Sequence, residues 1–324
     1  MNNLTVSQIK NAEFKLYKNN PIIKPFDSFI VADPSLLTPD KAIDGKWHMF
    51  LHTNLGVYHF ISDDGIDFKK VKRILPRAMR PNINYVDGKY YLFYERTAPL
   101  IINALTLVNL AKWHSEIYVT ESDDLMNWNK PRKVIGNTKS YEKDKRGIAI
   151  SNPYLMKDND GFILYYSCGQ TFIPDCGFCE PTYISYAVSR NVDRDYISAE
   201  EPIISPDKKN PYLNLCSGCM KVYKLSDGYV GFQNGIYDEN GKSKSAIIML
   251  TSDNGKDFKF GKMILQPQMC DSNDWMHQFV YASHLVKYDN KLRLYFNARD
   301  VANPLKGREC IGFCEAEIPR KSDV

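Results

Sequence analysis

Two Cys-x-x-Cys pairs are the residues whose types and spacing most directly suggest chemistry. Cys176 and Cys179 form the first pair, Cys216 and Cys219 form the second, and the two pairs begin 40 residues apart. Four thiolates could hold a structural zinc ion, and one pair alone could exchange disulfides, although no βαβ pattern surrounds either pair. The chain contains eight cysteines in total, so ordinary buried thiols are the simpler interpretation.

The elements that position these cysteines belong to a repeat. Its unit is an apolar strand, a Ser/Asp/Gly turn, an aromatic residue and a second strand that ends in two aliphatic residues. The unit occurs as "GVYHFISDDGIDFKKVKRIL" (56–75), "EIYVTESDDLMNWNKPRKVI" (116–135), "YISYAVSRNVDRDYISAEEPII" (183–204) and "AIIMLTSDNGKDFKFGKMIL" (246–265). Its period-2 alternation and hairpin turns indicate strands rather than a helical solenoid.

A second hairpin precedes each unit. Its second strand is recognisable five times, as "GKWHMFLH" (45–52), "GKYYLFYE" (88–95), "GFILYYSC" (161–168), "GYVGFQNG" (228–235) and "NKLRLYFNA" (290–298). Four strands per repeat make a propeller blade. We therefore predict an all-β fold, a five-bladed β-propeller in which residues 1–324 form a single domain. The expected blades are 27–75, 80–135, 148–204, 215–265 and 277–318.

The last blade lacks a fourth strand at the C-terminus. The N-terminal segment "FKLYKNNPII" (14–23) resembles the fourth strands "FKKVKRIL" and "FKFGKMIL". We predict that this N-terminal strand pairs into the last blade and closes the ring, because closure removes exposed strand edges. The matched units and this permuted fragment argue against two stacked sandwiches.

Strand direction in a propeller brings a defined set of polar residues to one face. The starts of the first strands and the loops between second and third strands lie together there, because strands within a blade are antiparallel. The first-strand starts are Asp33, Arg80, Asn152, Ser217 and His284. The loops and insertions add Glu95, Trp113, Glu180, Trp275, Arg299 and Asp300. We expect the functional site on this face.

Three segments carry a resemblance to a known group. "VADPSLL", "RPNINYVDGKYYLFY" and "SNPYLMKDNDGFILYYS" resemble the five-bladed propeller glycoside hydrolases, above all family 43 and its fructosidase-like and mannoside-phosphorylase-like relatives. The resemblance extends over about residues 14–318 on the repeat pattern and implies catalysis on a sugar in the central pocket.

The family pattern implies three carboxylates at first-strand starts. An Asp in an Asp-Pro motif of blade 1 acts as base or nucleophile, an Asp in blade 3 orients, and a Glu in blade 4 is the general acid. Only Asp33, in "VADPS", matches. Asn152 stands at the blade 3 position and Ser217 at the blade 4 position, so the chain departs from the group where the proton donor is expected.

Two carboxylates on the same face could replace the missing acid. Glu95 ends the second strand of blade 2, and its alternative role is a salt bridge to Arg96 or Arg80. Glu180 lies in "CGFCEPTY", and its alternative role is that of a solvated loop residue. Glycoside cleavage needs one group that protonates the leaving oxygen and another that activates water or attacks carbon.

The remaining candidates suit sugar binding. Arg80, Asn152 and Arg299 could bind hydroxyl or carboxylate groups, and two arginines on one face suggest an acidic sugar or a phosphate. The list of further binding candidates is Ser217, Trp113, Trp275, His284 and Asp300. Structural pairing with neighbouring acids is the alternative for the arginines, and Asp300 could pair with Arg299.

We expect neither a cofactor nor a catalytic metal. The resemblance leaves open a channel cation near His284 or His277, but a lone histidine is more often a hydrogen-bonded core residue. The zinc ion on the cysteine pairs stays the less favoured alternative.

Composition limits the partners. The net charge of +4 is mild and dispersed, which argues against nucleic acid. No apolar run is long enough to span a bilayer. The first residues lack the apolar segment of a secretory signal, and so many cysteines suggest a reducing compartment, so we expect a cytoplasmic protein. The apolar insertion 97–115 could be a lid or a contact between identical subunits.

The sequence therefore predicts a glycoside hydrolase-like enzyme with a carbohydrate ligand, in which Asp33 acts as base or nucleophile and Glu95 or Glu180 as acid. Two alternatives remain open. One is a carbohydrate-binding propeller without catalysis, which the missing blade 3 and blade 4 carboxylates favour. The other is transfer of a sugar to phosphate or to another sugar in the same pocket.

Overall fold

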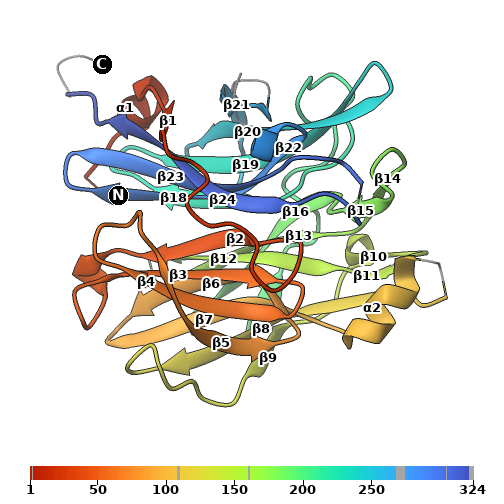
Figure 1. Ribbon diagram of the computed structural model, residues 1–324, viewed down its shortest axis with the longest axis horizontal. Coiled ribbons are helices and arrows are strands. Elements are labelled where there is room, and N and C mark those ends of the chain that lie inside the picture. The colour runs from red at the N-terminus through yellow and green to blue at the C-terminus, as the bar shows by residue number, and fades with distance from the viewer. Residues whose placement is uncertain (2, 108–109, 160, 268–273, 304, 321–324) are drawn as a thin grey trace.

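The repeating hairpins form five antiparallel sheets arranged as a propeller in the computed structural model (Figure 1). The structure describes residues 1, 3–107, 110–159, 161–267, 274–303 and 305–320. Cys270 lies outside the described residues. The sheets follow the predicted repeat, so the all-β, five-bladed fold is confirmed.

The strands are consecutive hairpins in every blade. Blade 1 contains β2 (Ala32–Leu37), β3 (Trp47–Thr53), β4 (Gly56–Ser62) and β5 (Lys69–Pro76). Blade 2 contains β6 (Ala78–Val86), β7 (Lys89–Thr97), β8 (Trp113–Ser122) and β9 (Arg132–Ile135). Blade 3 contains β12 (Ile150–Asp158), β13 (Gly161–Cys168), β16 (Tyr183–Ser189) and β17 (Ile197–Ser198). Blade 4 contains β18 (Met220–Lys224), β19 (Tyr229–Glu239), β20 (Lys242–Ser252) and β21 (Lys259–Leu265).

Blade 5 is completed by the N-terminal segment, as predicted. Its own strands are β22 (Phe279–Tyr288), β23 (Lys291–Arg299) and β24 (Glu309–Glu317). The short strand β1 (Lys15–Leu16) pairs antiparallel with β24, and Leu16 lies opposite Cys314. The backbone N–H of Ile22 continues the contact by donating to the carbonyl of Ile311 at 2.8 Å. The two chain ends are thus joined in one sheet, which closes the ring.

The hydrophobic core lies between the blades. Neighbouring blades cover both faces of a strand such as β20, so Ile247, Ile248 and Met249 are consecutive and all 0% exposed. This burial explains why the segment is a continuous apolar run. Polar and apolar residues alternate only in a strand that has one face exposed to solvent, and this strand is buried on both faces.

The repeated turns explain the Ser/Asp/Gly signature. The hydroxyl oxygens of Ser62, Ser122 and Ser252 each accept a hydrogen bond at 3.0 Å from the backbone N–H three residues later. That later residue has a positive φ, 73° at Gly65 and 72° at Gly255, a conformation that favours glycine. The turn acids bond inside their own turns, and Asp64 accepts from the N–H groups of Ile66 and Asp67. They are hairpin residues rather than site residues.

The first strands share a left-handed residue that aims the backbone toward the channel. The φ angles are 53° at Asp33, 51° at Arg80, 49° at Asn152 and 59° at Gly218. The ladder of hydrogen-bonded pairs shifts around three of these positions, and it shifts between Val280 and Ser283 in blade 5. A bulge of this kind re-aims a side chain at the rim of a sheet.

This register corrects two positions predicted from the sequence. Gly218, not Ser217, occupies the blade 4 position equivalent to Asp33. Tyr281, not His284, occupies the blade 5 position. Blades 1 to 3 place a proline after the left-handed residue, whereas blades 4 and 5 have Cys219 and Ala282 there, so the motif that marks the register is missing.

Insertions decorate one side of the ring. The helix α2 (Leu100–Leu107) and the hairpins β10 (Lys143–Asp144) with β11 (Gly147–Ile148) and β14 (Thr171–Ile173) with β15 (Phe178–Glu180) lie near one another in Figure 1. The other short helices are α1 (Val6–Asn11), η1 (Pro39–Lys41), η2 (Ser140–Glu142) and η4 (Asp274–Met276). None of the helices in the described part of the chain has the length and apolar character needed to cross a membrane.

Candidate functional site

The starts of the first strands surround a cavity of about 100 Å³, which we call the inner chamber. Each blade contributes one equivalent residue to its lining: Asp33, Arg80, Asn152, Gly218 and Tyr281. Other polar residues of the lining are His52, Glu180, Asn234, Asn297 and Glu309. The chamber therefore contains three carboxyl groups that come from different parts of the chain.

A hydrogen bond holds the backbone of Asp33, and its carboxyl group faces the chamber. Its backbone N–H donates to Oδ1 of Asn297 at 3.2 Å. Burial raises the pKa of the Asp33 carboxyl, and the positive charges of Arg80 and Lys221 oppose that rise. The two cations limit the rise, because a neighbouring positive charge favours the ionised form of a carboxyl group.

His52 is a neutral neighbour of Asp33. Its Nδ1 lies 3.4 Å from Oδ2 of Asp33 and accepts a hydrogen bond of 3.2 Å from the backbone N–H of Arg80. Burial lowers the pKa of His52 to about 3, and the charge of Arg80 adds to this effect. An uncharged ring forms no ion pair with Asp33, so His52 links blades 1 and 2 without neutralising the carboxylate.

Arg80 forms an ion pair with Glu95 across the first hairpin of blade 2. Oε2 of Glu95 accepts from Arg80, whereas Oε1 is buried and has no partner among the described residues. Glu95 is 0% exposed, so the pair is a buried one, and removal of either partner would leave an uncompensated charge. Glu95 thus forms the ion pair that the sequence left open as its alternative role.

Glu180 has an environment that favours its protonated form. It ends β15 and reaches both the inner chamber and a larger neighbouring cavity. Burial raises the pKa of Glu180 to about 8; the carboxyl groups of Glu309 and Asp33 reinforce the rise, and Arg80 and Arg299 oppose it. A carboxyl group that keeps its proton near pH 7 can serve as a general acid.

Arg299 is held within blade 5 by structural contacts. Its guanidinium donates to Oε1 of Glu309 at 2.8 Å and to the carbonyl oxygens of Val301 at 2.8 Å and Asn303 at 2.9 Å. Oε2 of Glu309 accepts from Asn297 at 3.0 Å. All three guanidinium nitrogens are engaged, so Arg299 positions Glu309 rather than offering donors to a ligand.

Lys221 and His284 lie three residues after Gly218 and Tyr281 along the first strands of blades 4 and 5. Lys221 is buried and donates to the carbonyl of Pro34 at 2.9 Å. His284 occupies the equivalent level in blade 5, beside the rings of Tyr154 and Tyr223, and lines a cavity on the opposite face. Burial holds the pKa of His284 well below its usual range. His284 therefore lies away from the chamber on which its predicted role depended.

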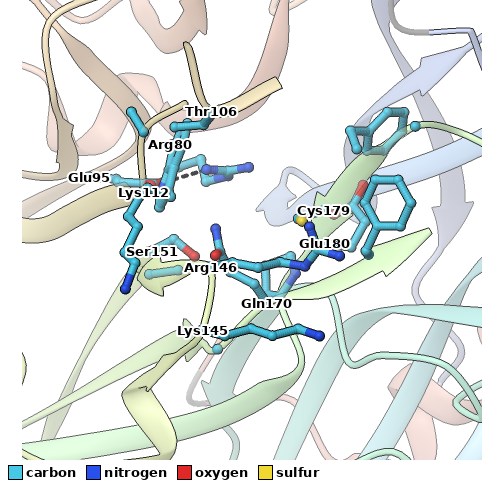
Figure 2. A pocket seen from close by; sticks show the side chains of 18 of the residues that line it. Arg80, Glu95, Thr106, Lys112, Lys145, Arg146, Ser151, Gln170, Cys179 and Glu180 are labelled. Atoms are coloured by element: carbon cyan, nitrogen blue, oxygen red, sulfur yellow. Dashed lines mark hydrogen bonds and ion pairs between the residues drawn. The ribbon is translucent and has the colours of Figure 1, made fainter. Parts of the chain in front are cut away.

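A second cavity, of about 860 Å³, adjoins the inner chamber, and we call it the outer cavity. Arg80, Glu180 and Pro181 line both spaces. Figure 2 shows the Arg80–Glu95 pair on one side of the outer cavity and Glu180 on the other. Trp113 is part of its wall, and the indole N–H donates to Oγ of Ser115 at 3.0 Å.

Three predicted binding residues lie elsewhere. Ser217 is 0% exposed and lies one residue before the chamber position of Gly218. Trp275 stacks on Phe296 with ring centroids 5.7 Å apart, so it packs within blade 5. Asp300 accepts from the backbone N–H of Arg308 at 2.7 Å and closes an exposed loop. Asn152, in contrast, lines the chamber as predicted.

The four cysteines of the two pairs lie in different surroundings. Cys176 and Cys216 belong to one buried apolar cluster, whereas Cys219 lines the inner chamber and Cys179 lies on the outer cavity. No group of three or more His, Cys, Asp or Glu residues with metal-binding geometry occurs among the residues that the structure describes. Burial raises the pKa of the Cys219 thiol to about 12, which disfavours the thiolate that zinc requires.

Several chamber residues were absent from the predicted site. Glu309 and Asn297 stand on β24 and β23, and the register of that hairpin places Glu309 directly opposite Arg299. Counting the residues of the hairpin from its turn would have predicted this pair from the sequence. Tyr281 gave no comparable signal, because its position depends on a bulge that the sequence does not mark.

No protein-family model matches the chain, and no curated protein matches it. Several solved structures, in contrast, are similar to the chain. A crystal structure of an N-acetylgalactosamine deacetylase from F. plautii, in complex with blood group B trisaccharide, superposes with a TM-score of 0.67 at 12% identity over 94% of this chain and 93% of that one. A family 43 endo-arabinanase from Bacillus licheniformis gives a TM-score of 0.55 at 16% identity over 90% of this chain and 96% of that one.

A third structure comes from the family 130 mannoside phosphorylases, which contains glycoside hydrolases that target β-1,2 mannosidic linkages in Candida mannan. It gives a TM-score of 0.61 at 14% identity and covers 97% of this chain and 96% of that one. The chain has the fold of the five-bladed propeller glycoside hydrolases. The low identities establish this shared fold, and the chemistry must be argued from the chamber itself.

Proposed function

We propose that the chain is a glycoside hydrolase-like enzyme that acts on a sugar or oligosaccharide at the inner chamber. Asp33 is the base or nucleophile, and Glu180 is the general acid. The observation that carries this proposal is the meeting of these two carboxyl groups in one small chamber on the propeller axis. The first-strand bulge of blade 1 presents Asp33, and the β14–β15 hairpin presents Glu180.

Their surroundings give the two groups different roles. Burial raises the pKa of both groups; for Glu180 two neighbouring carboxyl groups add to the rise, to about 8, whereas for Asp33 the nearby charges of Arg80 and Lys221 only oppose it. Glycoside cleavage uses one protonated and one ionised carboxyl group on the two sides of the scissile bond. Glu180 would give its proton to the leaving oxygen, while Asp33 would activate water or attack the anomeric carbon.

Glu95 is the second candidate for the acid, and its contacts favour a positioning role. One of its oxygens holds Arg80, and its strand position is fixed by pairing with Met79. Arg80 in turn lines the chamber beside Asp33 and Glu180. The Glu95–Arg80 pair therefore sets the charge between the two reacting groups.

The proposal places the enzyme in the cytoplasm. The seven cysteines that the structure describes are all free thiols, which agrees with a reducing compartment.

Asp33→Asn tests the proposal. We expect turnover on a panel of aryl glycosides and oligosaccharides to fall by about 100- to 10,000-fold, while calorimetric affinity for the same ligands is retained. Asp123→Asn, an exposed acid in a hairpin turn, is the matched control and should behave like the wild type. Each assay is run with and without inorganic phosphate, so that transfer to phosphate is distinguished from hydrolysis. Glycan binding by a wild-type protein that turns over no member of the panel would favour the non-catalytic propeller instead.

A further inference from the structure

Two arginines at or next to the inner chamber are paired with carboxylates: Arg80 lines the chamber, and Arg299 contacts the lining residue Glu309. Arg80 pairs with Glu95, and Arg299 pairs with Glu309. Each pair joins the two strands of its own hairpin. The two arginines therefore carry little excess charge toward a ligand, although their positions on the active face suggested an acidic sugar or phosphate.

Three other cations line the outer cavity: Lys112, Lys145 and Arg146. Among the described residues, none of these side chains forms an ion pair or a hydrogen bond with a carboxylate. The guanidinium of Arg146 lies 4.6 Å above the ring of Phe172, which fixes its plane and leaves its donors available. Figure 2 shows the three side chains around the same cavity, with Arg146 between the Arg80–Glu95 pair and Glu180.

A small sheet holds these cations in place. Strand β11 pairs in parallel with the start of β8, so Gly147 lies opposite Trp113. The backbone N–H of Trp113 also donates to the carbonyl of Arg146 at 2.9 Å. A side chain at position 147 would not fit, because its Cβ would lie 2.0 Å from the carbonyl oxygen of Trp113. The loop that carries Lys145 and Arg146 is thus joined to the strand that follows Lys112.

The rest of the lining suits a sugar. Trp113, Phe172 and Phe178 supply apolar ring faces, and sugar rings can pack against such faces while their hydroxyl groups bond to polar atoms. Oε1 of Gln170 is buried without a partner in the described structure and can accept from a hydroxyl group. The volume of about 860 Å³ lies within the range of small-molecule sites.

The lining carries an excess of positive charge. Glu95 is matched by Arg80. Among the described residues, the one other acid of the lining is Glu180, whose pKa of about 8 keeps it largely protonated at pH 7. The charges of Lys112, Lys145 and Arg146 are therefore uncompensated, and cations of one sign in a cleft attract anionic ligands.

We propose that the substrate is an anionic glycan, whose carboxylate, sulfate or phosphate group is bound in the outer cavity by Lys112, Lys145 and Arg146. This inference rests on the proposed function, because it places the scissile bond at the inner chamber and the anionic sugar beside it. Arg146 offers the planar pair of donors that matches carboxylate and phosphate oxygens, and the two lysines offer point charges.

Binding to matched probes tests the inference. Calorimetry compares trigalacturonate, triglucuronate, a sulfated trisaccharide and mannose 6-phosphate with their methyl-esterified or uncharged counterparts, and inorganic phosphate and sulfate are titrated separately. We expect at least one acidic glycan to bind roughly tenfold or more tightly than its uncharged counterpart, the gain of one charge-assisted hydrogen bond. The triple variant Lys112→Gln, Lys145→Gln, Arg146→Gln should remove that preference. Lys143→Gln, an exposed lysine of the same hairpin outside the lining, is the control.

Three outcomes would overturn the inference. They are equal binding of acidic and uncharged probes, a preference that survives in the triple variant, and inorganic phosphate that binds more tightly than every acidic glycan. The last outcome would identify the cations as a site for free phosphate.

Failure of the catalytic proposal gives a different result. If Asp33→Asn keeps full turnover while the triple variant loses the acidic preference, the anion site stands and the assignment of Asp33 falls. If Asp33→Asn loses turnover and the triple variant keeps the preference, the catalytic proposal stands and the anion site falls.

Discussion

The inner chamber and the outer cavity use positive charge in opposite ways. At the chamber, Arg80 forms an ion pair with Glu95, and Arg299, beside the chamber, forms one with Glu309. In the outer cavity, Lys112, Lys145 and Arg146 lack such a carboxylate in the described structure. The chamber is lined mainly by the repeated strands, with Glu180 added by the inserted β14–β15 hairpin, whereas the three cations of the cavity come from insertions. On the proposed function, the repeat would supply most of the reaction site, and the insertions would supply the surface that selects a substrate.

The largest expected effect comes from removing the proton donor of the chamber. Glu180→Gln keeps the shape of the side chain but cannot give up a proton, so we expect kcat to fall by about 100- to 10,000-fold. In the wild type, activity should be lost as the pH rises through about 8, because Glu180 is then ionised. It should also be lost in acid, when Asp33 becomes protonated.

The pH dependence of kcat/KM measures both the loss of activity at alkaline pH, the alkaline limb, and the loss of activity in acid. If the residual activity of Glu180→Gln still fell at alkaline pH as it does in the wild type, a group other than Glu180 would be responsible for that fall. Glu95→Gln is the comparison variant, and full loss of the alkaline limb in that variant alone would move the acid role to Glu95.

The second prediction compares a paired with an unpaired cation. Arg80→Leu leaves the buried carboxylate of Glu95 without its partner, which should lower the free energy of unfolding by about 3–5 kcal/mol. Lys145→Leu removes an exposed cation that has no carboxylate partner, and the change should stay within about 0.5 kcal/mol. Denaturant unfolding measures both values.

The double variant Arg80→Leu, Glu95→Leu is the control for this comparison. Because it removes both buried charges together, it should recover most of the lost stability. Equal losses in Arg80→Leu and Lys145→Leu would show that the two regions do not differ in the way their charges are balanced.

The sequence predicted the region built from the repeat better than the region built from insertions. Asp33, Arg80 and Asn152 were placed correctly because each precedes a proline in a matching apolar strand. Gly218 and Tyr281 were missed because no proline follows them, and a bulge shifts the count of residues along the strand. Arg299 and Glu309 pair through a hairpin register that can be counted, but burial decides whether such a pair is structural or available to a ligand, and burial depends on the neighbouring blade.

The cations of the outer cavity illustrate what the sequence could not reveal. Lys145 and Arg146 follow blade 2 in a segment without repeat pattern, and their position depends on the pairing of Gly147 with Trp113. Parallel pairing between a linker and a distant strand leaves no periodic signal. The net charge of +4 is dispersed over the chain, so composition does not indicate a local excess of charge.

The third prediction disturbs the position of these cations without changing their charge. Gly147→Val would place Cβ 2.0 Å from the carbonyl oxygen of Trp113, at a φ of +135°. The hairpin must move away from β8, and affinity for an acidic glycan should fall roughly tenfold, as for a lost charge-assisted hydrogen bond. Turnover of a small uncharged substrate should stay within about twofold, since the chamber strands are not touched.

Gly45→Val is the matched control for backbone strain. Gly45 also has a positive φ, +68°, but no atom lies within 4 Å of its added Cβ. An equal loss of acidic-glycan affinity in both variants would mean that general destabilisation, rather than displacement of the hairpin, is responsible.

The fourth prediction is a pH-dependent change of stability in the chamber. The folded-state pKa of Glu180, about 8, lies above its ordinary value of 4.5, so the folded chain binds a proton that the unfolded chain releases. The stability associated with this proton is complete in acid and is lost as the pH rises through about 8. Glu180→Gln should therefore melt at a higher temperature than the wild type at pH 9, and the difference should shrink toward pH 5. A difference that is independent of pH would contradict the buried, protonated state of Glu180.

The smallest expected effect separates the two regions by their response to salt. Lys112 and Lys145 are exposed, so dissolved ions can screen their attraction to an anionic sugar. Raising NaCl from 50 to 500 mM should weaken acidic-glycan binding by about 1.4- to fivefold in total, the factor that corresponds to the roughly 0.2–1 kcal/mol of an exposed ion pair. The pH dependence attributed to the half-buried Asp33 and Glu180 should change less, because partly buried charges are screened less than exposed ones. If salt shifted that pH dependence strongly and left the affinity unchanged, the reacting carboxyl groups would be the solvent-exposed ones, and the division between a balanced chamber and an unbalanced cavity would have to be reversed.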